Sequence, residues 1–575
     1  MNSAFAAHDS GKYPLTGFTR FFIRGMMLAI TAVGFMLNGN VQGQICTILH
    51  NFGDGSISND GTNPTGTLIQ GSDGIFYGTT SSGGLGGAGT VFKMVPQGTV
   101  TILHNFHDGS VANDGMEPLA GIIPGTNGNF YGTTVAGGSP GSGMIGGTVF
   151  KITPQGIETI LHNFGDQSVG FDGGQPVASL IQGTDGNFYG TTQLADSSPS
   201  SYFGTVFKIT PQGTVTILHR FGNGSVVNDG QYPQGSLIYG QDGNFYGVAA
   251  VGGASNMGII FKITPTGTMV VMHSFGTGEG NGPIAGLILG TDGNFYGTTL
   301  AGGSANQGTV YKMTPGGTVT TLHHFGDGSI VNDGTAPYAG LIQGFDGNFY
   351  GITSSGGSAN QGTIYKMTPE GTVTILHHFG DGSTTNDGNV PMYGNLIQGL
   401  DGNFYGTTSK GGSAGQGVVF KFTPLRGTFS QWEAVYFNAQ QLDNLAICGA
   451  EAIPENDKTP NLLKYFFDIN PSTPMSALDR AALPVGALTT TGNGQYLTLT
   501  YRQNATQTGI QVNVQKSSDL QTWQTVIPDI NQNLSTDPVT GDPIVRVGIN
   551  TTNFTNPSEE FIRLNVTYTP PPRDL

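Results

Sequence analysis

Three short sequence strings recur seven times in a fixed order between His50 and Lys421, and this repetition limits the possible fold more than any other feature. The strings have the forms DGNFYG, GTVFK and TILHxFG. Their marker residues are Tyr77, Tyr131, Tyr189, Tyr246, Tyr296, Tyr350 and Tyr405; Lys93, Lys151, Lys208, Lys262, Lys312, Lys366 and Lys421; and His50, His104, His162, His219, His273, His323 and His377. A repeat of about 50 residues that contains four short strands is typical of the blades of a β-propeller.

The sixth repeat shows how one unit is expected to fold. Its apolar runs predict four strands, at residues 341–343, 349–353, 363–367 and 372–379. The dipeptide Asp346-Gly347 predicts a hairpin turn between the first two strands. The tripeptide Pro369-Glu370-Gly371 predicts a turn between the last two strands. A glycine-rich run at residues 354–362 predicts a loop between the second strand and the third.

Apolar residues are expected on both faces of these strands. In the fourth strand, strict alternation places Val373, Ile375, His377 and Phe379 on one face and Leu376 on the other. In the third strand it places Ile364 on one face and Tyr365 and Met367 on the other. A sheet with one wetted face would alternate cleanly between apolar and polar residues. We therefore expect each sheet to be covered on both sides, as blades packed around an axis are.

The repeat region begins and ends out of phase. It opens with a lone fourth strand, at residues 47–52, and finishes with a third strand at residues 417–423. An open stack gives no reason for this offset, whereas in a closed ring the N-terminal strand completes the last sheet and removes its free edge. The sequence therefore predicts an all-β fold in which residues 44–426 form a seven-bladed β-propeller. The N-terminal strand is expected to complete the blade that contains Tyr405.

The repeats resemble a known family. The strings DGNFYGTT, GGxxxxGTVFKxTPxG and TVTILHxFG, which recur in this order over residues 46–424, are similar to the GloVer tandem repeat of exported bacterial proteins. The resemblance implies an extracellular location. It supplies no established activity and no catalytic residues.

Residues 1–43 have the organisation of a secretory signal peptide. Arg20 and Arg24 precede an apolar run, Gly25 to Leu37, and Val41-Gln42-Gly43 offers a cleavage site. The alternative is a retained membrane anchor, but the run is shorter than the roughly 20 residues that a spanning helix needs. The expected protein is therefore secreted or held in the cell envelope, without a transmembrane anchor after cleavage.

Residues 427–575 are expected to form a small accessory domain, either α+β or a β-sandwich. A short helix is predicted at residues 461–467, and strands are predicted from Gln495, Ile510, Pro543 and Glu560. The segment resembles a C-terminal module of exported proteins in which a calcium loop precedes the helix. Here Ile453 stands at the first ligand position and Lys458 at the glycine position, so the resemblance does not carry calcium binding over to this loop.

The charge and the repeated polar residues limit the possible ligands. A net charge of −16 without a basic stripe makes nucleic acid an unexpected partner. The seven histidines could be metal ligands, but one per blade on an apolar strand favours a structural, hydrogen-bonded role. The loops that begin at Gly53, His107, Gly326 and Gly380 are rich in aspartate and glycine, so they predict either calcium sites or Asx-turns.

No catalytic and no cofactor-binding residue can be assigned from the sequence. The first strands are expected to line the central channel with Gln70, Pro124, Gln182, Tyr239, Leu289, Gln343 and Gln398, none of which is an acid or a base. The motif HExxH and the P-loop are missing from the sequence. Glu117, Glu279 and Lys410 depart from the repeat, but turns and solvated faces explain them equally well.

Two hypotheses about function follow. The favoured one is a non-catalytic extracellular or cell-envelope protein that acts as a binding or scaffold module, for a glycan or a protein. The alternative is a propeller enzyme that acts on carbohydrate, as a hydrolase or a lyase. Paired carboxylates in one funnel would favour the enzyme, and an uncharged funnel would favour binding.

The chain has two cysteines, Cys46 and Cys448. Ring closure would bring both to one side of the molecule, and an oxidising compartment would allow a disulfide between them. The alternative is two unrelated thiols.

Overall fold

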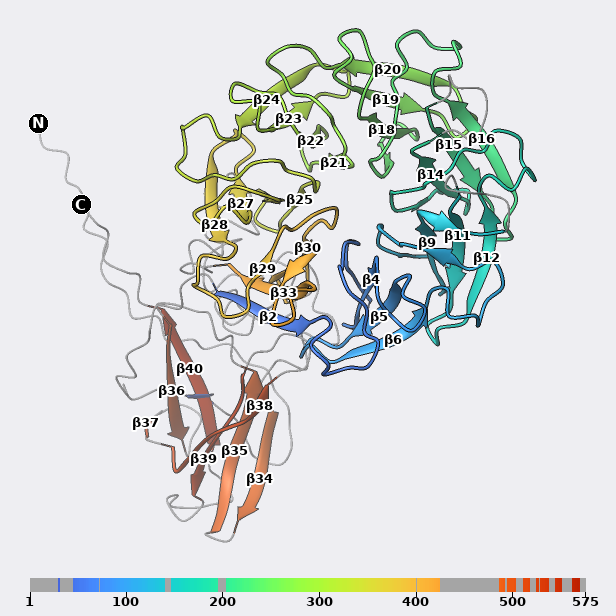
Figure 1. Ribbon diagram of the computed structural model, residues 1–575. Helices are drawn as coiled ribbons and strands as arrows, with labels where there is room; N and C mark the ends of the chain where they lie inside the picture. The colour runs from blue at the N-terminus through green and yellow to red at the C-terminus, as the bar shows by residue number, and fades with distance from the viewer. Residues whose placement is uncertain are drawn as a thin grey trace, which may run out of the picture. The chain divides into compact units, whose positions relative to one another are not determined.

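The computed structural model describes residues 29–30, 45–71, 73–139, 146–194, 203–399 and 401–424, and, nearer the C-terminus, residues 485–491, 494–502, 510–517, 524–526, 528–536, 543–550 and 561–568. Every regular element among these residues is a β-strand. The chain divides into two compact units, residues Gln44–Pro424 and the remaining residues, which we call the repeat unit and the second unit. In the repeat unit, successive sheets follow one another around a common centre (Figure 1).

The described part of the repeat unit contains seven four-stranded antiparallel sheets, numbered 1 to 7 in the order of their first strands. The first strands are β3 (Ile69–Gln70), β8 (Ile123–Pro124), β13 (Ile181–Gln182), β17 (Ile238–Tyr239), β21 (Ile288–Leu289), β25 (Ile342–Gln343) and β30 (Ile397–Gln398). The second strands are β4 (Phe76–Thr80), β9 (Phe130–Thr134), β14 (Phe188–Thr192), β18 (Phe245–Ala249), β22 (Phe295–Thr299), β26 (Phe349–Thr353) and β31 (Phe404–Thr408).

The third strands are β5 (Thr90–Met94), β11 (Thr148–Ile152), β15 (Thr205–Ile209), β19 (Ile259–Ile263), β23 (Thr309–Met313), β27 (Thr363–Met367) and β33 (Val418–Thr423). The fourth strands, which lie at the outer rim in Figure 1, are β6 (Val100–Asn105), β12 (Glu158–Asn163), β16 (Val215–Arg220), β20 (Met269–Ser274), β24 (Val319–His324), β28 (Val373–His378) and, in sheet 7, β2 (Ile45–Asn51). Two further strand pairs are β7 (Gly115–Met116) with β10 (Ala136–Gly137) and β29 (Gly388–Asn389) with β32 (Lys410–Gly411).

The strands predicted for the sixth repeat agree with β25, β26, β27 and β28 to within one residue at each end. The turn between the first two strands is held by Asp346, whose Oδ1 accepts a hydrogen bond from the Asn348 amide at 3.2 Å. Gly347 adopts a positive φ of 74° in this turn, which glycine reaches without steric cost. The predicted hairpin turn at Asp346-Gly347 is therefore confirmed.

The N-terminal strand pairs with the last repeat. Strand β2 runs antiparallel to β33, with Cys46 opposite Phe422 and Asn51 opposite Val418. The amide of Phe52 extends the pairing by donating to the Gly417 carbonyl oxygen at 3.0 Å. Because β33 also pairs with β31, which contains Tyr405, the N-terminal strand lies in the sheet that the sequence predicted.

Neighbouring sheets contact one another through two sets of aromatic pairs. A second-strand tyrosine packs on the second-strand phenylalanine of the next sheet, at centroid distances from 3.9 Å for Tyr131–Phe188 to 4.4 Å for Tyr77–Phe130. A phenylalanine after the fourth strand meets the third-strand aromatic of the next sheet edge to face, as in Phe106–Phe150 at 5.3 Å. Both contacts also join sheet 7 to sheet 1. The pairs there are Tyr405–Phe76 at 4.3 Å and Phe52–Phe92 at 5.3 Å.

A glycine turn brings adjacent sheets together. Gly98, between the third and fourth strands of sheet 1, has a φ of 94°. A Cβ atom there would lie 2.1 Å from the carbonyl oxygen of Leu49 in β2. Only glycine therefore permits this approach of sheet 1 to the N-terminal strand.

The predicted alternation along the fourth strand is wrong at one point. Ile364 pairs with His377 and Tyr365 pairs with Ile375, so Leu376 is the extra residue of a β-bulge. A bulge resets the alternation of side chains. As a result Val373 packs into the core shared with sheet 5, with Ile375 against it, while Phe379 packs into the core shared with sheet 7. The expectation that both faces are covered is confirmed.

Two tyrosines are expected to weaken the repeat unit. The hydroxyls of Tyr311 and Tyr365 are fully buried and have no hydrogen-bond partner among the described residues. The equivalent residues of the other third strands are Phe92, Phe150, Phe207, Phe261 and Phe420. A buried, unpaired hydroxyl costs about 1–3 kcal/mol. We expect Tyr311→Phe and Tyr365→Phe each to raise the free energy of unfolding by about 1 kcal/mol in urea titrations.

Tyr296→Phe is the matched control for these substitutions. The Tyr296 hydroxyl donates to Asp292 at 2.8 Å, so its loss is expected to lower the stability. A lower stability of Tyr311→Phe would contradict the prediction.

The second unit contains two four-stranded sheets among its described residues. One consists of β1 (Ala29–Ile30), β40 (Phe561–Tyr568), β36 (Ile510–Ser517) and β37 (Gln524–Thr525), and the other of β34 (Val485–Thr491), β35 (Gly494–Arg502), β39 (Pro543–Asn550) and β38 (Ile530–Thr536). Strands β35, β36, β39 and β40 are the four that the sequence predicted. Strands β34 and β38 were not predicted.

Several expectations fall outside the described residues. These are the helix at residues 461–467, the loop at residues 453–458, and Cys448. Within the predicted leader, only Ala29–Ile30 is described, and a chain cut after residue 43 would lack this short strand. In the described part of the chain, no helix combines the length and hydropathy required to cross a bilayer.

Candidate functional site

Each fourth-strand histidine is hydrogen-bonded, through Nε2, to a carboxylate in the loop that follows the strand. The seven pairs are His50–Asp60 (2.8 Å), His104–Asp114 (3.2 Å), His162–Asp172 (2.7 Å), His219–Asp229 (2.9 Å), His273–Glu279 (2.9 Å), His323–Asp333 (2.9 Å) and His377–Asp387 (3.1 Å). Most of these side chains are buried. The hydrogen bonding predicted for the histidines is therefore confirmed.

Sequence reasoning missed the acidic partners of these histidines. In six repeats the aspartate stands ten residues after the histidine, and in sheet 4 Glu279 replaces it at a separation of six. The same carboxylate also accepts a hydrogen bond from the start of the loop, as Asp172 does from the Gly165 amide at 3.1 Å. The fixed spacing between histidine and aspartate was visible in the sequence and could have revealed the pairs.

The first aspartate of each candidate calcium loop forms an Asx-turn. Asp54 Oδ1 accepts a hydrogen bond from the Ser56 amide at 2.8 Å, and the hydrogen bonds from Ser56 lower the pKa of Asp54. Equivalent 2.8 Å bonds join Asp108 to Ser110, Asp327 to Ser329 and Asp381 to Ser383. The alternative interpretation of these loops, as Asx-turns, is confirmed by this geometry.

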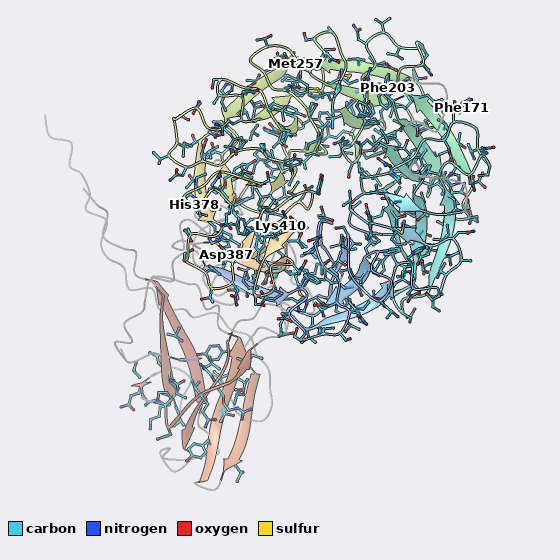
Figure 2. The ribbon with its side chains drawn as sticks, in the orientation of Figure 1. Phe171, Phe203, Met257, His378, Asp387 and Lys410 are labelled. Carbon is cyan, nitrogen blue, oxygen red and sulfur yellow. The ribbon has the colours of Figure 1, made fainter. Side chains whose placement is uncertain are left out.

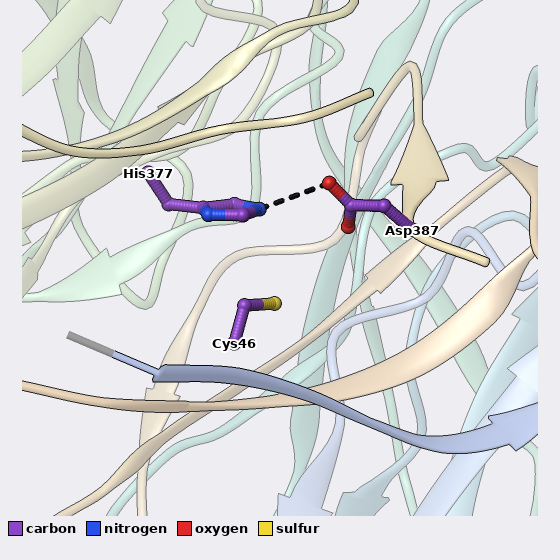
Figure 3. Close-up of side chains that lie close together, drawn as sticks. All are labelled: Cys46, His377 and Asp387. Atoms are coloured by element: carbon purple, nitrogen blue, oxygen red, sulfur yellow. Dashed lines mark hydrogen bonds and ion pairs between the residues drawn. The ribbon is translucent and has the colours of Figure 1, made fainter. Parts of the chain in front are cut away.

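Two repeats place an additional potential ligand beside a histidine–aspartate pair. The position four residues before the fourth-strand histidine is Val100, Val215, Met269, Val319 or Val373 in five sheets, Glu158 in sheet 2 and Cys46 in sheet 7. Glu158 joins His104 of sheet 1 and Asp114 of the loop that follows it, with 2.9 Å between Glu158 Oε2 and His104 Nε2. Cys46 lies beside the His377–Asp387 bond (Figure 3). In each group the ligand atoms lie within 4.8 Å of one another, so these six residues could hold a metal ion.

Burial sets the protonation of both groups. Burial, aided by the charge of Asp387, raises the pKa of the Cys46 thiol. A protonated thiol is a poor nucleophile, so this Cys-His-Asp group is unsuited to covalent catalysis. Burial also raises the pKa of Glu158. Although burial lowers the pKa of His104, the hydrogen bonds that His104 donates to Asp114 and Glu158 raise it overall.

The predicted disulfide is not tested, because Cys448 lies outside the described residues. Cys46 itself is a buried free cysteine. Its side chain packs in the core between sheets 6 and 7, where Phe379 and Phe420 also lie.

A cavity of about 230 Å³ takes at least one lining residue from the segment before the first strand of each of the seven sheets. The equivalent lining residues are Thr67, Gly121, Ser179, Ser236, Gly286, Gly340 and Asn395. Hydrogen bonds link neighbouring segments: Ser179 Oγ donates to the Gly121 carbonyl at 3.0 Å, and the Asn395 amide donates to Thr67 Oγ1 at 2.9 Å. The Thr67–Asn395 bond joins the first repeat to the seventh.

The described residues that line this cavity are all uncharged. Tyr338 and Tyr393 stand edge to face, with 5.7 Å between their ring centroids, and Tyr393 is 44% exposed. The amides of Gln193, Gln234 and Asn395 add donors and acceptors. The cavity therefore offers aromatic faces and neutral hydrogen-bonding groups.

The residues predicted to line a central channel lie outside the lining of this cavity. Gln70, Pro124, Gln182, Tyr239, Leu289, Gln343 and Gln398 lie in first strands as expected, but none of them lines the cavity. Two of the glutamines hold the hairpin of the preceding sheet: Gln182 Oε1 accepts from the Thr126 amide at 3.0 Å, and Gln398 Oε1 from the Phe345 amide at 2.8 Å. The cavity is lined by the residues just before these strands.

The three residues that depart from the repeat also lie outside the lining of the cavity. Glu279 replaces aspartate in the histidine pair of sheet 4. Glu117 directly follows β7 and has a positive φ of 58°. Lys410 is exposed in β32, opposite the strand that follows Asp387 (Figure 2).

Solved structures show only distant likeness to this chain. The extracellular domain of a protein named as a hybrid two-component system of B. thetaiotaomicron is 11% identical with a TM-score of 0.41, over 64% of this chain and 40% of that one. A protein named as a 6-phosphogluconolactonase from Bacteroides uniformis is 14% identical with a TM-score of 0.37, over 58% of this chain and 96% of that one. The match thus spans less than half of the first of these chains, and TM-scores this low support no statement about activity.

No curated protein is similar enough in sequence to count as a relative. The model of the Gloeobacter/Verrucomicrobia repeat, in contrast, matches residues 31–241, 110–291 and 232–444. These overlapping matches cover all seven recurrences of the three strings and more than half of the chain. The chain belongs to the Gloeobacter/Verrucomicrobia repeat family.

Proposed function

We propose that this chain is an exported, non-catalytic binding protein that takes an uncharged sugar residue of a glycan into the cavity of its repeat unit. The observation that carries the proposal is the cavity itself, to which all seven sheets contribute and in which the described lining is uncharged with two tyrosines. Export directed by the leader at residues 1–43, followed by its removal, would place the protein in the cell envelope or outside the cell.

The proposal includes a closed seven-bladed propeller at residues 44–424. Its support is that sheet 7 contacts sheet 1 through the same two aromatic pairs that join the other neighbouring sheets. The β2–β33 pairing and the hydrogen bond from Asn395 to Thr67 add contacts between the two ends of the repeat region. A closed ring would keep the seven cavity segments at fixed positions relative to one another.

The lining of the cavity favours binding over hydrolysis. Most glycoside hydrolases need two carboxyl groups that flank the scissile bond. Among the described residues around this cavity there is no carboxylate. Tyrosine rings pack against the apolar faces of sugars, and neutral amides bind their hydroxyls, so the lining suits recognition. A cavity of about 230 Å³ admits a single sugar residue and excludes a folded protein.

The test is a glycan-array screen followed by calorimetry on protein purified from the exporting cells, whose N-terminal residue also reports leader removal. We expect Tyr338→Ala and Tyr393→Ala each to weaken binding of the best glycan at least about tenfold, a loss of about 1.4 kcal/mol. Phe345→Ala is the matched control, because this exposed aromatic residue lies outside the lining and should leave the affinity unchanged. Unchanged affinity in both tyrosine variants, or release of a shortened glycan, would overturn the proposal.

A further inference from the structure

We propose that the repeat unit binds a divalent cation of the zinc class at two related places. One is the group of His104, Asp114 and Glu158, between sheets 1 and 2. The other is the group of Cys46, His377 and Asp387, between sheets 6 and 7. Neither place belongs to the cavity assigned to glycan.

The two groups arise from the same departure from the repeat. In five sheets an apolar side chain stands four residues before the fourth-strand histidine. Glu158 and Cys46 replace that apolar residue, and each contributes its ligand atom to the histidine–aspartate pair of the preceding sheet. Both substitutions place a metal-binding side chain at the single fourth-strand position that meets the neighbouring pair.

The aspartates of these two groups differ from the others in their hydrogen bonds. In the remaining histidine–aspartate pairs, Oδ1 of the aspartate accepts from the amide at the start of the loop, at 3.1–3.2 Å; these aspartates are Asp60, Asp172, Asp229 and Asp333. In two of them the same amide also reaches Oδ2, at 3.0 Å for Asp229 and 3.4 Å for Asp333. In the two groups, that amide donates to Oδ2, the atom that also contacts the histidine, and not to Oδ1. The distances are 2.7 Å for Asp114 and 2.9 Å for Asp387.

This change leaves carboxylate oxygens unpaired in buried surroundings. Asp114 Oδ1, Asp387 Oδ1 and Glu158 Oε1 have no hydrogen-bond partner among the described residues. The exposed fractions of the side chains are 1% for Asp114, 3% for Asp387 and 0% for Glu158. Buried polar atoms are nearly always paired, so these unpaired oxygens indicate that each group binds a ligand.

The charge of each group matches a divalent cation. With a metal bound, His104 is a neutral ligand, so the histidine and two carboxylates give a formal charge of −2 in the first group, and binding releases the histidine proton to water. Neutral histidine with a carboxylate and a thiolate gives the same charge in the second. Burying such a charge uncompensated is costly, whereas a divalent cation neutralises it. Binding at the second group releases the thiol proton of Cys46 to water, because only the thiolate is a ligand.

The donor atoms select the class of metal. Zinc accepts imidazole nitrogen, carboxylate oxygen and thiolate sulfur, at bond lengths of about 2.0–2.3 Å. Calcium and magnesium prefer oxygen ligands and do not suit cysteine. In a tetrahedral site two ligand atoms stand about 3.3–3.8 Å apart. The atoms of both groups, within 4.8 Å of one another, reach that spacing by small side-chain rotations.

The test begins with the full-length protein, stripped of metal by a chelator, dialysed and titrated with zinc alone. We expect two equivalents of zinc per chain, measured by mass spectrometry of metals and by calorimetry. Glu158→Val and Cys46→Val should each lose one equivalent, and the double variant should lose both. Valine occupies the equivalent position in four other sheets, so these variants should fold.

Cobalt distinguishes the two places. Cobalt bound to a thiolate gives an intense near-ultraviolet band, which we expect in the parent protein and in Glu158→Val but not in Cys46→Val. Asp229→Asn is a matched control, because Asp229 pairs with His219 with no third ligand beside it, so the metal content should not change. A folded parent protein that takes up no zinc, or a double variant that takes up as much as the parent, would overturn the proposal.

Discussion

Deletion of residues 45–52 is expected to destroy the cooperative thermal unfolding of the repeat unit. The deletion removes β2 and leaves the whole length of β33 as an exposed edge. It also removes Phe52, which is fully buried against Phe92, and the loss of such a side chain alone costs about 3–5 kcal/mol. Ile48 and Leu49 pack against the cores on either side of sheet 7. A typical domain is stable by only about 5–15 kcal/mol, so the loss takes most of its stability.

Calorimetry and circular dichroism give the measurement. The control is deletion of residues 427–575, which leaves β2 and β33 intact and should preserve the transition of the repeat unit. Addition of a synthetic peptide of residues 45–52 to the strand-deleted protein is expected to restore part of the transition. Equal melting temperatures for the full-length and strand-deleted proteins would refute the prediction.

Asp172→Ala is expected to lower the free energy of unfolding by about 3–5 kcal/mol, the usual cost of removing one partner of a buried pair. The Asp172 side chain is fully buried, 2.7 Å from His162 Nε2, and it also accepts from the Gly165 amide. The substitution therefore leaves both donors without a partner. Urea titration at neutral pH gives the measurement.

Asp166 provides the matched control in the same loop. It is partly exposed and accepts only a local hydrogen bond from the Ser168 amide. Its replacement by alanine should cost no more than about 1 kcal/mol. If the two variants lost the same stability, the histidine–aspartate pair would not be the source of the effect.

The strand positions could be predicted because three strings mark them in every repeat. Turns such as Asp346-Gly347 and the offset of the N-terminal strand were visible in the same way. The faces of the fourth strand could not be predicted by counting, since the bulge at Leu376 inserts a residue that alternation cannot detect. In the second unit, β34 and β38 lie in stretches rich in threonine, asparagine and glutamine, which offer no clear apolar signal.

The cavity was harder to predict than the strands. The glutamines of the first strands are polar residues of the kind that line ligand sites. The side chain of Gln182, however, accepts a hydrogen bond from the hairpin of the preceding sheet. The residues that do line the cavity, such as Ser179 and Gly286, are small and carry no motif. Their position depends on hydrogen bonds between neighbouring repeats, and these bonds cannot be predicted from the sequence of a single repeat.

The pairing of β2 with β33 also constrains how the chain reaches this structure. The hydrogen bond from the Ser413 amide to Asn51 spans 362 positions of sequence, so β2 is made long before its partner. Contacts of such separation form slowly, and the six other sheets, whose strands are local in sequence, are free to assemble first. While β2 is still unpaired, it can also pair with β33 of another molecule, which gives a strand-exchanged oligomer. Refolding at high protein concentration should therefore yield oligomers that dilute refolding avoids.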